Sequence, residues 1–350
     1  MKTEIIRIEN PSFPDSSLLS LAAQTIKRGG LVVFPTETVY GIGADATNES
    51  AVAAIFEAKG RPSDNPLIIH IAEPSDAEKY AYTTDLYYKL AQSFMPGPLT
   101  VVLKAKNVVP KRTRGGLDTV AVRCPVAPIA RELIRLSETA IAAPSANLSG
   151  SPSPTTAKHV IDDMLGRVDV IIDGGEADFG LESTIVKIED DGSLTLLRPG
   201  KITVNDLSAF ARVNVADAVT DKLGEGEVAL SPGMKYRHYA PKAPLTLIDG
   251  EIEDMLEYIS GDSADNIAII AYEEDVAEAQ RAFPDAKVYN FGKTEDKMAQ
   301  AHRLFAILRE IDAEQFSQIY APLPEKTGIA LALYNRMIRA AAHKIIRMRR

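Results

Sequence analysis

Short apolar runs alternate with helix-like stretches along most of this chain, and this alternation limits its fold more than any other feature. From Leu31 to Arg198, runs rich in Val, Ile and Leu are separated by stretches with helical spacing of apolar residues. This is the pattern of a mixed α/β sheet. The pattern weakens after about Lys201 and resumes at Leu245. Because one domain commonly holds about 100 to 200 residues, the chain is predicted to form two α/β domains.

The first alternation predicts eight strands and five helices. The predicted strands are residues 31–34, 67–71, 99–103, 119–123, 140–143, 170–173, 184–188 and 194–197. The predicted helices are residues 14–27, 49–58, 85–94, 128–136 and 155–165. The first helix has start signals at Asp15 and Ser16 and a stop signal at Gly29.

The second alternation predicts a small three-stranded, Rossmann-like layer. Its strands and helices are expected at residues 245–248, 251–259, 267–272, 274–283, 288–291, 296–311 and 329–346. Before it, the segment SPGMKYRHYAP (231–241) is too rich in Pro, Gly and aromatic residues for a plain helix or strand. We therefore expect a larger domain at 1–205, a linker or lid at 206–243 and a C-terminal domain at 244–350.

Composition narrows the classes of function. The net charge is -9 and the isoelectric point about 5.2, so any contact with RNA must be local rather than a property of the whole surface. The single cysteine, Cys124, excludes an internal disulfide framework and fits a reducing cytoplasm. The first residues lack the apolar core of a signal peptide, and no run of about 20 apolar residues is present, so we expect no membrane segment.

Several residues and short patterns resemble nucleotide-binding, metal-binding or catalytic motifs, but we interpret them as coincidental matches. Residues 41–46 fit G-x-G-x-x-A, but six residues separate the preceding strand from the first glycine. Residues 292–294 resemble the end of a P-loop, but Lys287 stands where its first glycine belongs. The five histidines are scattered, which argues against a histidine-built metal site, and Cys124 is interpreted as a packing residue.

Polar groups follow several predicted strands and suit the binding of a small charged ligand. The segment PTETVYGIG (35–43) offers hydroxyls, a carboxylate and a phenol; the alternative is a turn with local threonine caps. Lys59 and Arg61, in KGRPSDNPL, could hold a polyphosphate or simply complement a helix C-terminus. Hydroxyl- and glycine-rich stretches recur at 142–154, 174–175 and 181–184, and Arg198 ends another strand.

Two further basic features stand out. Arg123 lies in an apolar strand, where a cation is expensive unless an anion pairs with it, and a substrate carboxylate is one such anion. Residues 104–114 carry five positive charges and no negative one, at Lys104, Lys106, Lys111, Arg112 and Arg114. This cluster is either a solvated loop or a local phosphate- or RNA-facing patch.

In this order, PTETVYGIG, KGRPSDNPL, SANLSG, LESTIV and LRPG resemble the YrdC/YwlC family of threonylcarbamoyl-AMP synthases. The linker and GIALALYNRMIRAA near the end resemble its longer, two-domain branch. The resemblance implies a twisted, open mixed α/β sheet with a concave cavity (YrdC-like), followed by a smaller Rossmann-like C-terminal α/β domain. It also implies that the domain at 1–205 is catalytic.

The resemblance implies synthesis of L-threonylcarbamoyl-AMP from L-threonine, bicarbonate and ATP, with release of pyrophosphate and with Mg²⁺ carried on ATP. A threonylcarbamoyl-transferase of the Kae/TsaD class would then modify tRNA beside the anticodon, with at most a weak tRNA contact by this chain. The implied threonine-binding residues are Thr38, His70, Arg123, Ala143 and Ser183. The implied ATP-binding residues are Lys59, Arg61, Asn65, Thr119, Ser145, Asn147, Ser153, Arg198, His238 and Tyr239, of which Lys59, Arg61, Ser145 and Asn147 serve catalysis.

Two other functions remain open at this point. An RNA-binding or regulatory module could use the same concavity without turnover, and the cluster at 104–114 favours it. A carbamoyl-transfer relative acting on protein would use carbamoyl phosphate instead of threonine.

Overall fold

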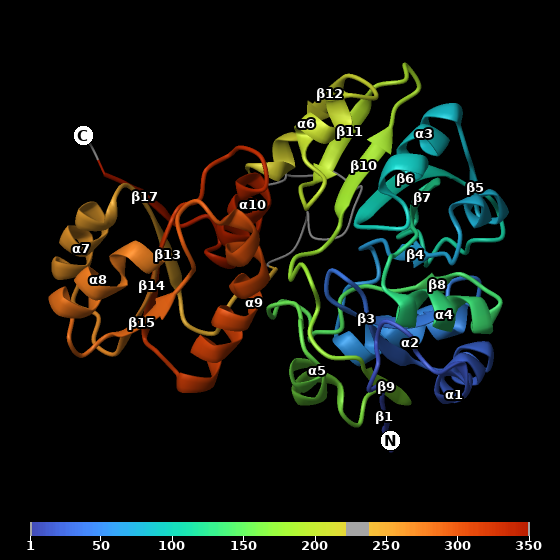
Figure 1. The fold of residues 1–350 in the computed structure, drawn as a ribbon, viewed down its shortest axis with the longest axis horizontal. Coiled ribbons are helices and arrows are strands. Elements are labelled where there is room, and N and C mark those ends of the chain that lie inside the picture. Colours follow the sequence, from blue (N-terminus) through green and yellow to red (C-terminus); the bar gives the residue numbers. More distant parts are fainter. Residues whose placement is uncertain (1, 222–237, 349–350) are drawn as a thin grey trace. The chain divides into compact units, whose positions relative to one another are not determined.

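The computed structural model describes residues 2–221 and 238–348, which divide into two compact units (Figure 1). Of the described residues, the N-terminal unit holds 2–149 and 153–221. The C-terminal unit holds 238–348 and also the short segment 150–152. Within the described residues no helix is long and apolar enough to cross a membrane.

A 12-stranded mixed sheet forms the centre of the N-terminal unit. Its strands are β1 (Glu4–Arg7), β2 (Val32–Pro35), β3 (Tyr40–Asp45), β4 (Ile68–His70), β5 (Ala81–Tyr82), β6 (Leu99–Ala105), β7 (Thr119–Arg123), β8 (Ile141–Ala142), β9 (Val170–Asp173), β10 (Thr184–Ile188), β11 (Leu194–Arg198) and β12 (Val213–Val215). The order across the sheet is β1-β9-β2-β3-β8-β4-β7-β6-β10-β11-β12, with β5 paired to β6.

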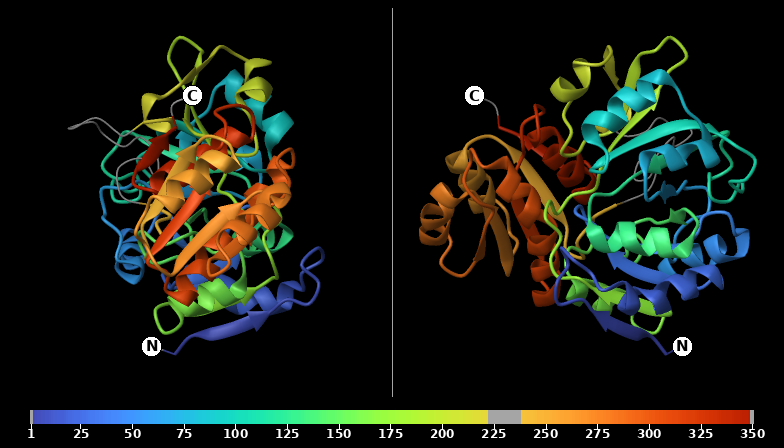
Figure 2. Two further views of the ribbon diagram at one scale, coloured as in Figure 1. Left: turned by 90° about the vertical axis from the view of Figure 1, so that its left-hand side faces the viewer. Right: turned by 45° about the vertical axis from the view of Figure 1, so that its right-hand side comes forward.

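Helices surround this sheet in the N-terminal unit. They are α1 (Ser16–Lys27), α2 (Glu49–Lys59), α3 (Asp85–Phe94), α4 (Pro128–Ser137), α5 (Ala157–Met164) and α6 (Val204–Ser208), with short 3-10 turns η1 (Pro74–Lys79) and η2 (Asp217–Val219). Helices α1 and α4 lie side by side (Figure 2). Their apolar faces pack on β2 and β9 in one buried cluster that includes Leu19, Val32, Leu133 and Val170.

The prediction of a mixed α/β sheet is confirmed, and several elements match to the residue. Strands 119–123, 170–173 and 184–188 and helix 85–94 have the predicted bounds. Helix α1 starts at its predicted signal, since the Asp15 side chain accepts a hydrogen bond from the Ser17 amide.

Four strands of this unit were absent from the sequence prediction: β1, β3, β5 and β12. The sequence analysis describes 35–43 as polar groups that follow a strand, but residues 40–45 form strand β3, which pairs antiparallel with β2. The sequence pattern did not indicate this strand, because glycine inside a strand weakens the local strand propensity. The glycines are needed here: a Cβ on Gly43 would lie 2.5 Å from Ile141 Cγ2 and 2.7 Å from Phe34 Cε1.

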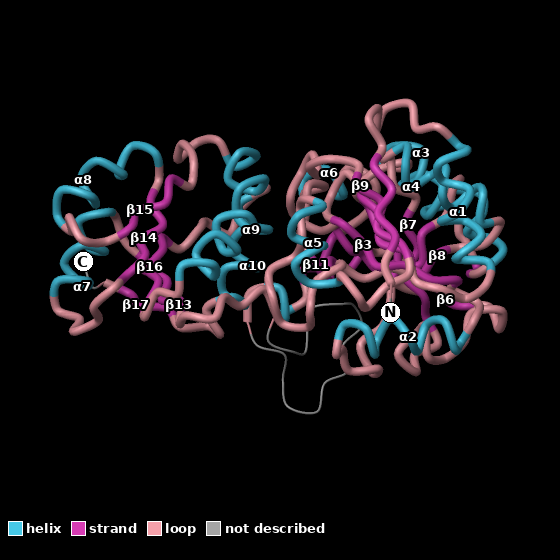
Figure 3. The backbone as a smooth tube through the Cα atoms, turned by 90° about the horizontal axis from the view of Figure 1, so that it is seen from below, coloured by secondary structure: helices cyan, strands magenta, loops and turns pink. Residues whose placement is uncertain are grey.

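The C-terminal unit contains a five-stranded, all-parallel sheet. Its strands are β13 (Leu245–Asp249), β14 (Ile267–Ala271), β15 (Lys287–Asn290), β16 (Gln318–Pro322) and β17 (Ile345–Arg347), in the order β15-β14-β16-β13-β17. Helices α7 (Ile252–Ser260) and α8 (Val276–Ala282), the latter preceded by the 3-10 turn η3 (Glu273–Asp275), cover one face (Figure 3). Helices α9 (Lys297–Glu314) and α10 (Ala330–Ala340) cover the other (Figure 3).

The prediction of three strands in this unit was wrong, because β16 and β17 were missed. The predicted helix 329–346 was also too long. Helix α10 ends at Ala340, and Ala342 and His343 take left-handed backbone conformations that stop it. Residues 345–347 then pair with β13. Ile345 and Ile346 continue the apolar spacing of the helix, so the spacing alone could not show this ending.

The segment predicted as a linker, 206–243, is described only in part. Residues 213–215 form β12, which pairs with β11 in the large sheet. Residues 222–237, including most of SPGMKYRHYAP, lie outside the described residues.

Candidate functional site

Three polar side chains stand in register across neighbouring strands of the N-terminal sheet. His70 at the end of β4 is the register partner of Arg123 at the end of β7. Arg123 is in turn the partner of Thr100 in β6. Side chains of directly opposed residues point to the same face of a sheet. His70, Arg123 and Thr100 therefore form one buried polar row in a sheet that is otherwise mostly apolar.

The polar row continues onto the next pair of strands. The hydroxyl oxygens of Thr100 and Ser183 are 2.8 Å apart. Arg198, at the end of β11, donates from Nε to the Ser183 carbonyl at 3.0 Å and from Nη2 to the Ser183 hydroxyl at 3.1 Å. The structure thus joins a predicted threonine-binding residue, Ser183, directly to a predicted ATP-binding residue, Arg198.

His70 is buried, and its ring meets the Phe34 ring edge-on at 6.3 Å between centroids. Burial lowers the pKa of His70 to about 3, and the positive charges of Arg123 and Arg198 contribute in the same direction. The imidazole is therefore neutral at pH 7 and can take part in hydrogen bonding without bringing a third positive charge to the row.

Arg123 has an anionic partner inside the protein. Its Nη2 donates to Glu37 Oε1 at 2.6 Å, and both side chains are buried, with 5% and 7% of their surfaces exposed. The requirement that an anion accompany this cation is thus met by Glu37, which the sequence analysis did not name. A guanidinium has five N–H donors, so the pair leaves donors for a further anion.

The turn that presents Glu37 is fixed from both sides. Within it, Thr36 Oγ1 donates to the Val39 carbonyl at 2.7 Å and lies 2.8 Å from Thr38 Oγ1. Across the turn, the Phe179 amide donates to the Glu37 carbonyl at 2.9 Å, and the next amide donates to the Thr38 carbonyl at 3.1 Å. The side chains of Glu37 and Thr38 therefore start from a rigid backbone.

Lys59 and the SxN motif meet at a second cluster. Lys59 is 2% exposed, and its Nζ donates to the carbonyls of Ser145 and Asn147 at 2.5 Å each. The Ser145 hydroxyl donates to Asn147 Oδ1, also at 2.5 Å. Helix α2 can end at Lys59 because Gly60 takes the left-handed conformation that closes it. The lysine thus organises the loop that carries two other predicted ATP-binding residues.

Arg61, Asn65 and Thr119 are three further predicted ATP-binding residues of this unit. Arg61 is buried and donates to the Pro66 carbonyl at 3.4 Å. Asn65 is also buried, and its Oδ1 has no hydrogen-bond partner among residues 2–221 and 238–348. Thr119 is half-buried at the start of β7, at the far end of that strand from Arg123.

Ala143 and Ser153 are placed by neighbouring segments. The Ala143 amide donates to the Ile68 carbonyl at 2.9 Å, next to the strand that carries His70. The Ser153 hydroxyl donates to Glu182 Oε1 at 2.5 Å, and both side chains are buried. Glu182 directly precedes Ser183, so Ser153 is linked to the segment that forms the end of the polar row.

His238 and Tyr239 belong to the C-terminal unit. The Tyr239 ring stacks on Phe305 of α9 with 5.1 Å between centroids, and the Arg336 guanidinium of α10 lies 5.9 Å from the same ring. The His238 ring is 5.0 Å from the Tyr239 ring. Helices α9 and α10 thus hold the end of the predicted linker.

The basic cluster at 104–114 has internal contacts. Arg114 is buried and donates to the carbonyls of Val109 and Leu117. Arg112 lies 3.6 Å from a Glu49 carboxylate oxygen, and the amino groups of Lys104 and Lys106 lie near the Tyr82 ring. At least one of the five charges therefore has a structural role.

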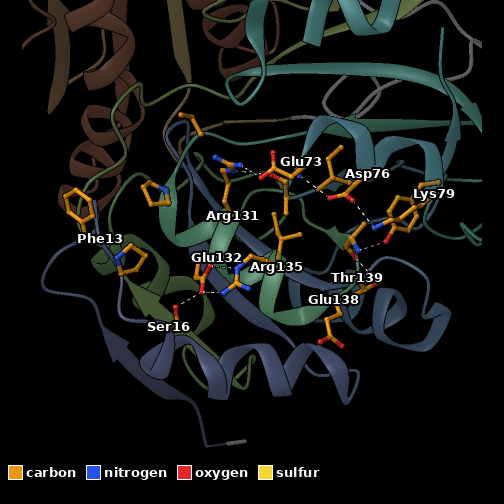
Figure 4. Close-up of a pocket in the computed structure, with 18 of the residues that line it drawn as sticks. Phe13, Ser16, Glu73, Asp76, Lys79, Arg131, Glu132, Arg135, Glu138 and Thr139 are labelled. Carbon is orange, nitrogen blue, oxygen red and sulfur yellow. Dashed lines mark hydrogen bonds and ion pairs between the residues drawn. The ribbon is translucent and has the colours of Figure 1, made fainter. Parts of the chain in front are cut away.

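A cavity of about 790 Å³ lies beside α4 and η1 (Figure 4), and none of the predicted site residues lines it. Six of its charged side chains form ion pairs with one another, namely Arg131 with Glu73, Lys79 with Asp76, and Arg135 with Glu132, and Glu138 pairs with Lys27 of α1. Because the charges of each pair offset one another, this cavity presents no concentrated charge to an ionic ligand.

Comparison with known proteins shows which family the chain is similar to. Residues 24–200 match the Sua5/YciO/YrdC family model, described as "Telomere recombination", and residues 202–342 match the model described as "Threonylcarbamoyl-AMP synthase, C-terminal domain". A threonylcarbamoyl-AMP synthase of Pyrococcus abyssi is 42% identical over 341 residues, covering 94% of this chain and 96% of the relative. One of Bacillus subtilis is 41% identical, with 94% of both chains covered.

This chain belongs to the threonylcarbamoyl-AMP synthase family. The crystal structure of P. abyssi Sua5 complexed with L-threonine matches it with a TM-score of 0.88 and 40% identity, covering 99% of this chain and all of that one. The family resemblance drawn from the sequence motifs and the expected two-domain α/β fold are both confirmed.

The sequence analysis did not name three polar residues that contact the predicted residues in this candidate site: Glu37, Thr100 and Glu182. Thr100 gave a signal, since it is a hydroxyl residue inside the apolar run 99–103. Glu37 and Glu182 lie within motifs that were recognised, PTETVYGIG and LESTIV, but neither was singled out. No cluster of three or more His, Cys, Asp or Glu side chains suited to a metal occurs in the described part of the chain.

Proposed function

We propose that this chain condenses L-threonine, bicarbonate and ATP into L-threonylcarbamoyl-AMP and releases pyrophosphate, for threonylcarbamoyladenosine formation beside the tRNA anticodon. As a family member the chain is an enzyme of the nucleotidyl-transfer type. The proposal is carried by its full-length similarity to proteins named threonylcarbamoyl-AMP synthase, one of them solved with L-threonine. The polar row supplies the matching chemistry, because its two arginines can hold two anionic substrates near each other.

The proposed reaction has two steps. The ammonium group of threonine first loses one proton to solvent. The resulting neutral amine adds to the carbon of bicarbonate, an N–C bond forms and water leaves, which gives N-carboxythreonine. One of the new carboxylate oxygens then attacks the α-phosphorus of ATP, and the bond to the bridging oxygen breaks so that pyrophosphate leaves with the electron pair. No protein nucleophile is needed, so the enzyme contributes positioning and electrostatic stabilisation.

The residues divide between two subsites in this proposal. Arg123 binds the threonine carboxylate, with Thr38, His70, Ala143 and Ser183 around the amino acid. ATP, arriving with Mg²⁺ on its phosphates, is bound by Lys59, Arg61, Asn65, Thr119, Ser145, Asn147, Ser153, Arg198, His238 and Tyr239. The hydrogen bonds between Ser183 and Arg198 support placing the two subsites next to each other.

The deciding experiment incubates the purified full chain with ATP, bicarbonate, Mg²⁺ and labelled threonine. We expect threonine-dependent release of pyrophosphate and a labelled adenylate. Arg61→Ala should raise the KM for ATP about tenfold or more, as loss of a hydrogen-bonded charge does. Arg7→Ala, which removes an exposed arginine of β1, should leave the KM unchanged. Absence of both products in the wild-type reaction would refute the proposal.

The same preparation tests the two other functions. Charge reversal at Lys104 and Lys106 should abolish tRNA binding if the chain is an RNA-binding module, with a steep dependence on salt. Product formation from carbamoyl phosphate without threonine would indicate a carbamoyl transferase acting on protein.

We also propose a cellular setting and a role for the second unit. The product passes to a Kae/TsaD-class transferase in the cytoplasm, with at most weak direct contact between this chain and tRNA. The C-terminal unit positions the linker as a lid over the nucleotide, and the stacking of Tyr239, near the end of that linker, on Phe305 supports this role. Deleting residues 245–350 should therefore raise the KM for ATP, and an unchanged KM would contradict this role.

A further inference from the structure

The carboxylate of Glu37 has one oxygen engaged and one available. Oε1 accepts the 2.6 Å hydrogen bond from Arg123 Nη2. Oε2 is buried and has no hydrogen-bond partner among the residues that the structure describes. Buried carboxylate oxygens are costly to leave without a donor, so an orphaned one calls for an explanation.

The turn that carries Glu37 is rigid, so the position of Oε2 is fixed by the structure. The turn 36–39 is fixed by its own threonine hydroxyls and by two amides, at 179 and 180. The side chain is 7% exposed and is held at one oxygen by Arg123. The second oxygen therefore keeps a defined position beside the guanidinium.

A carboxylate beside a guanidinium complements an α-amino acid. At neutral pH such a molecule carries a carboxylate and an ammonium on the same carbon atom, so the two charges stay close together. A site that binds both needs a cation and an anion equally close. Arg123 and Glu37 form such a pair, and charge-assisted hydrogen bonds to both groups are the stronger kind.

We infer that Glu37 Oε2 binds the amino group of the threonine substrate, while Arg123 binds its carboxylate. This assignment rests on the proposed function, because it presupposes that threonine is the amino acid. Glu37 then fixes the nitrogen that takes up bicarbonate, and the site selects an amino acid over the acid that lacks the amino group.

A thermodynamic cycle between one protein variant and one ligand analogue isolates this contact. Titration calorimetry on the full chain compares L-threonine with (R)-3-hydroxybutanoate, which is threonine without its amino group. We expect Glu37→Gln to weaken threonine binding about tenfold or more, as loss of a charged hydrogen-bond partner does. The affinity for the analogue should change less than twofold.

Three controls separate the contact from indirect effects. L-Threonine methyl ester lacks the carboxylate charge that Arg123 binds. Its affinity relative to L-threonine should therefore fall by the same factor in the wild type and in Glu37→Gln. Glu57→Gln removes an exposed glutamate of α2 and should change nothing. Glu37→Asp keeps a charge for Arg123 but withdraws the oxygens by one methylene, so the preference for threonine over the analogue should fall here as well.

The possible outcomes point in different directions. If Glu37→Gln and Glu37→Asp weaken threonine and the analogue by equal factors, Glu37 only orients Arg123 and the assignment is overturned. Unchanged threonine affinity in both variants overturns it as well. If the wild-type chain binds no threonine at all, the proposed function itself fails, which is a separate result.

Discussion

Replacing Lys59 by methionine tests how the SxN loop is held in place. The methionine side chain has a similar length and fills the same buried space, but it cannot donate to the carbonyls of Ser145 and Asn147, each of which lies 2.5 Å from Nζ. A hydrogen bond from a charged group contributes about 1.5 to 3 kcal/mol. Taking the lower value for each bond gives about 3 kcal/mol for local opening of this loop.

At about 1.4 kcal/mol for each factor of ten, this change corresponds to roughly a hundredfold larger population of the open loop. Hydrogen exchange followed by mass spectrometry should show faster uptake in peptides that cover 145–149 and little change in those that cover β13 and β14. Because the loop carries Ser145 and Asn147, ATP affinity should fall while threonine affinity changes much less.

A matched control is Lys158→Met, which removes an exposed lysine of α5 that pairs with Asp162. It should affect neither the exchange at 145–149 nor ATP binding. If Lys59→Met weakens ATP binding but leaves the exchange of 145–149 at the wild-type rate, the lysine does not act by organising the loop. Our reasoning from the two carbonyl contacts would then be refuted.

Three further predictions follow from burial at the site. Arg123→Met leaves Glu37 buried without its cation, so the unfolding free energy of the N-terminal unit in urea should fall by about 3 kcal/mol, and the double variant with Glu37→Gln should lose less than the sum of the two single changes. The pKa of His70 is lowered from its usual 6.5 to about 3 in the folded chain, so the unfolded chain binds the proton more readily. The free energy of unfolding should therefore decrease as pH falls from 6.5 toward 3. His70→Gln should flatten this part of a plot of urea midpoint against pH. Gly43→Ala places a Cβ 2.5 Å from a methyl of Ile141 and should cost about 1 to 3 kcal/mol in the same urea assay, whereas no measurable cost would show that the neighbouring side chains move freely.

Much of the fold was predictable because most of its strands and helices carry strong local signals. Strand 119–123 and helix 85–94 have clear apolar spacing and matched to the residue. The failures have local causes. Strand β3 contains two glycines, and β17 follows a helix whose apolar spacing continues past its end. In both places the structure depends on a partner strand that is distant in sequence, β8 for β3 and β13 for β17.

The motifs supplied the candidate residues, but not the contacts between them. Lys59 was assigned to the nucleotide, while its hydrogen bonds to Ser145 and Asn147 depend on the meeting of segments 86 and 88 residues apart. Arg123 was expected to need an anion, but Glu37 lies 86 residues away and only the fold brings them together. Chain separation of this size leaves no periodic signal in the sequence.

The sequence by itself determined the α/β class, the two-part organisation and the family, because local apolar patterns and ordered motifs carry this information. The tertiary structure alone decided which polar groups face one another: the row from His70 through Arg123 and Thr100 to Ser183, and the carboxylate of Glu37 beside it. Strand order and register produce this result. A shift of one residue in a strand would turn its side chains to the opposite face and disperse the row.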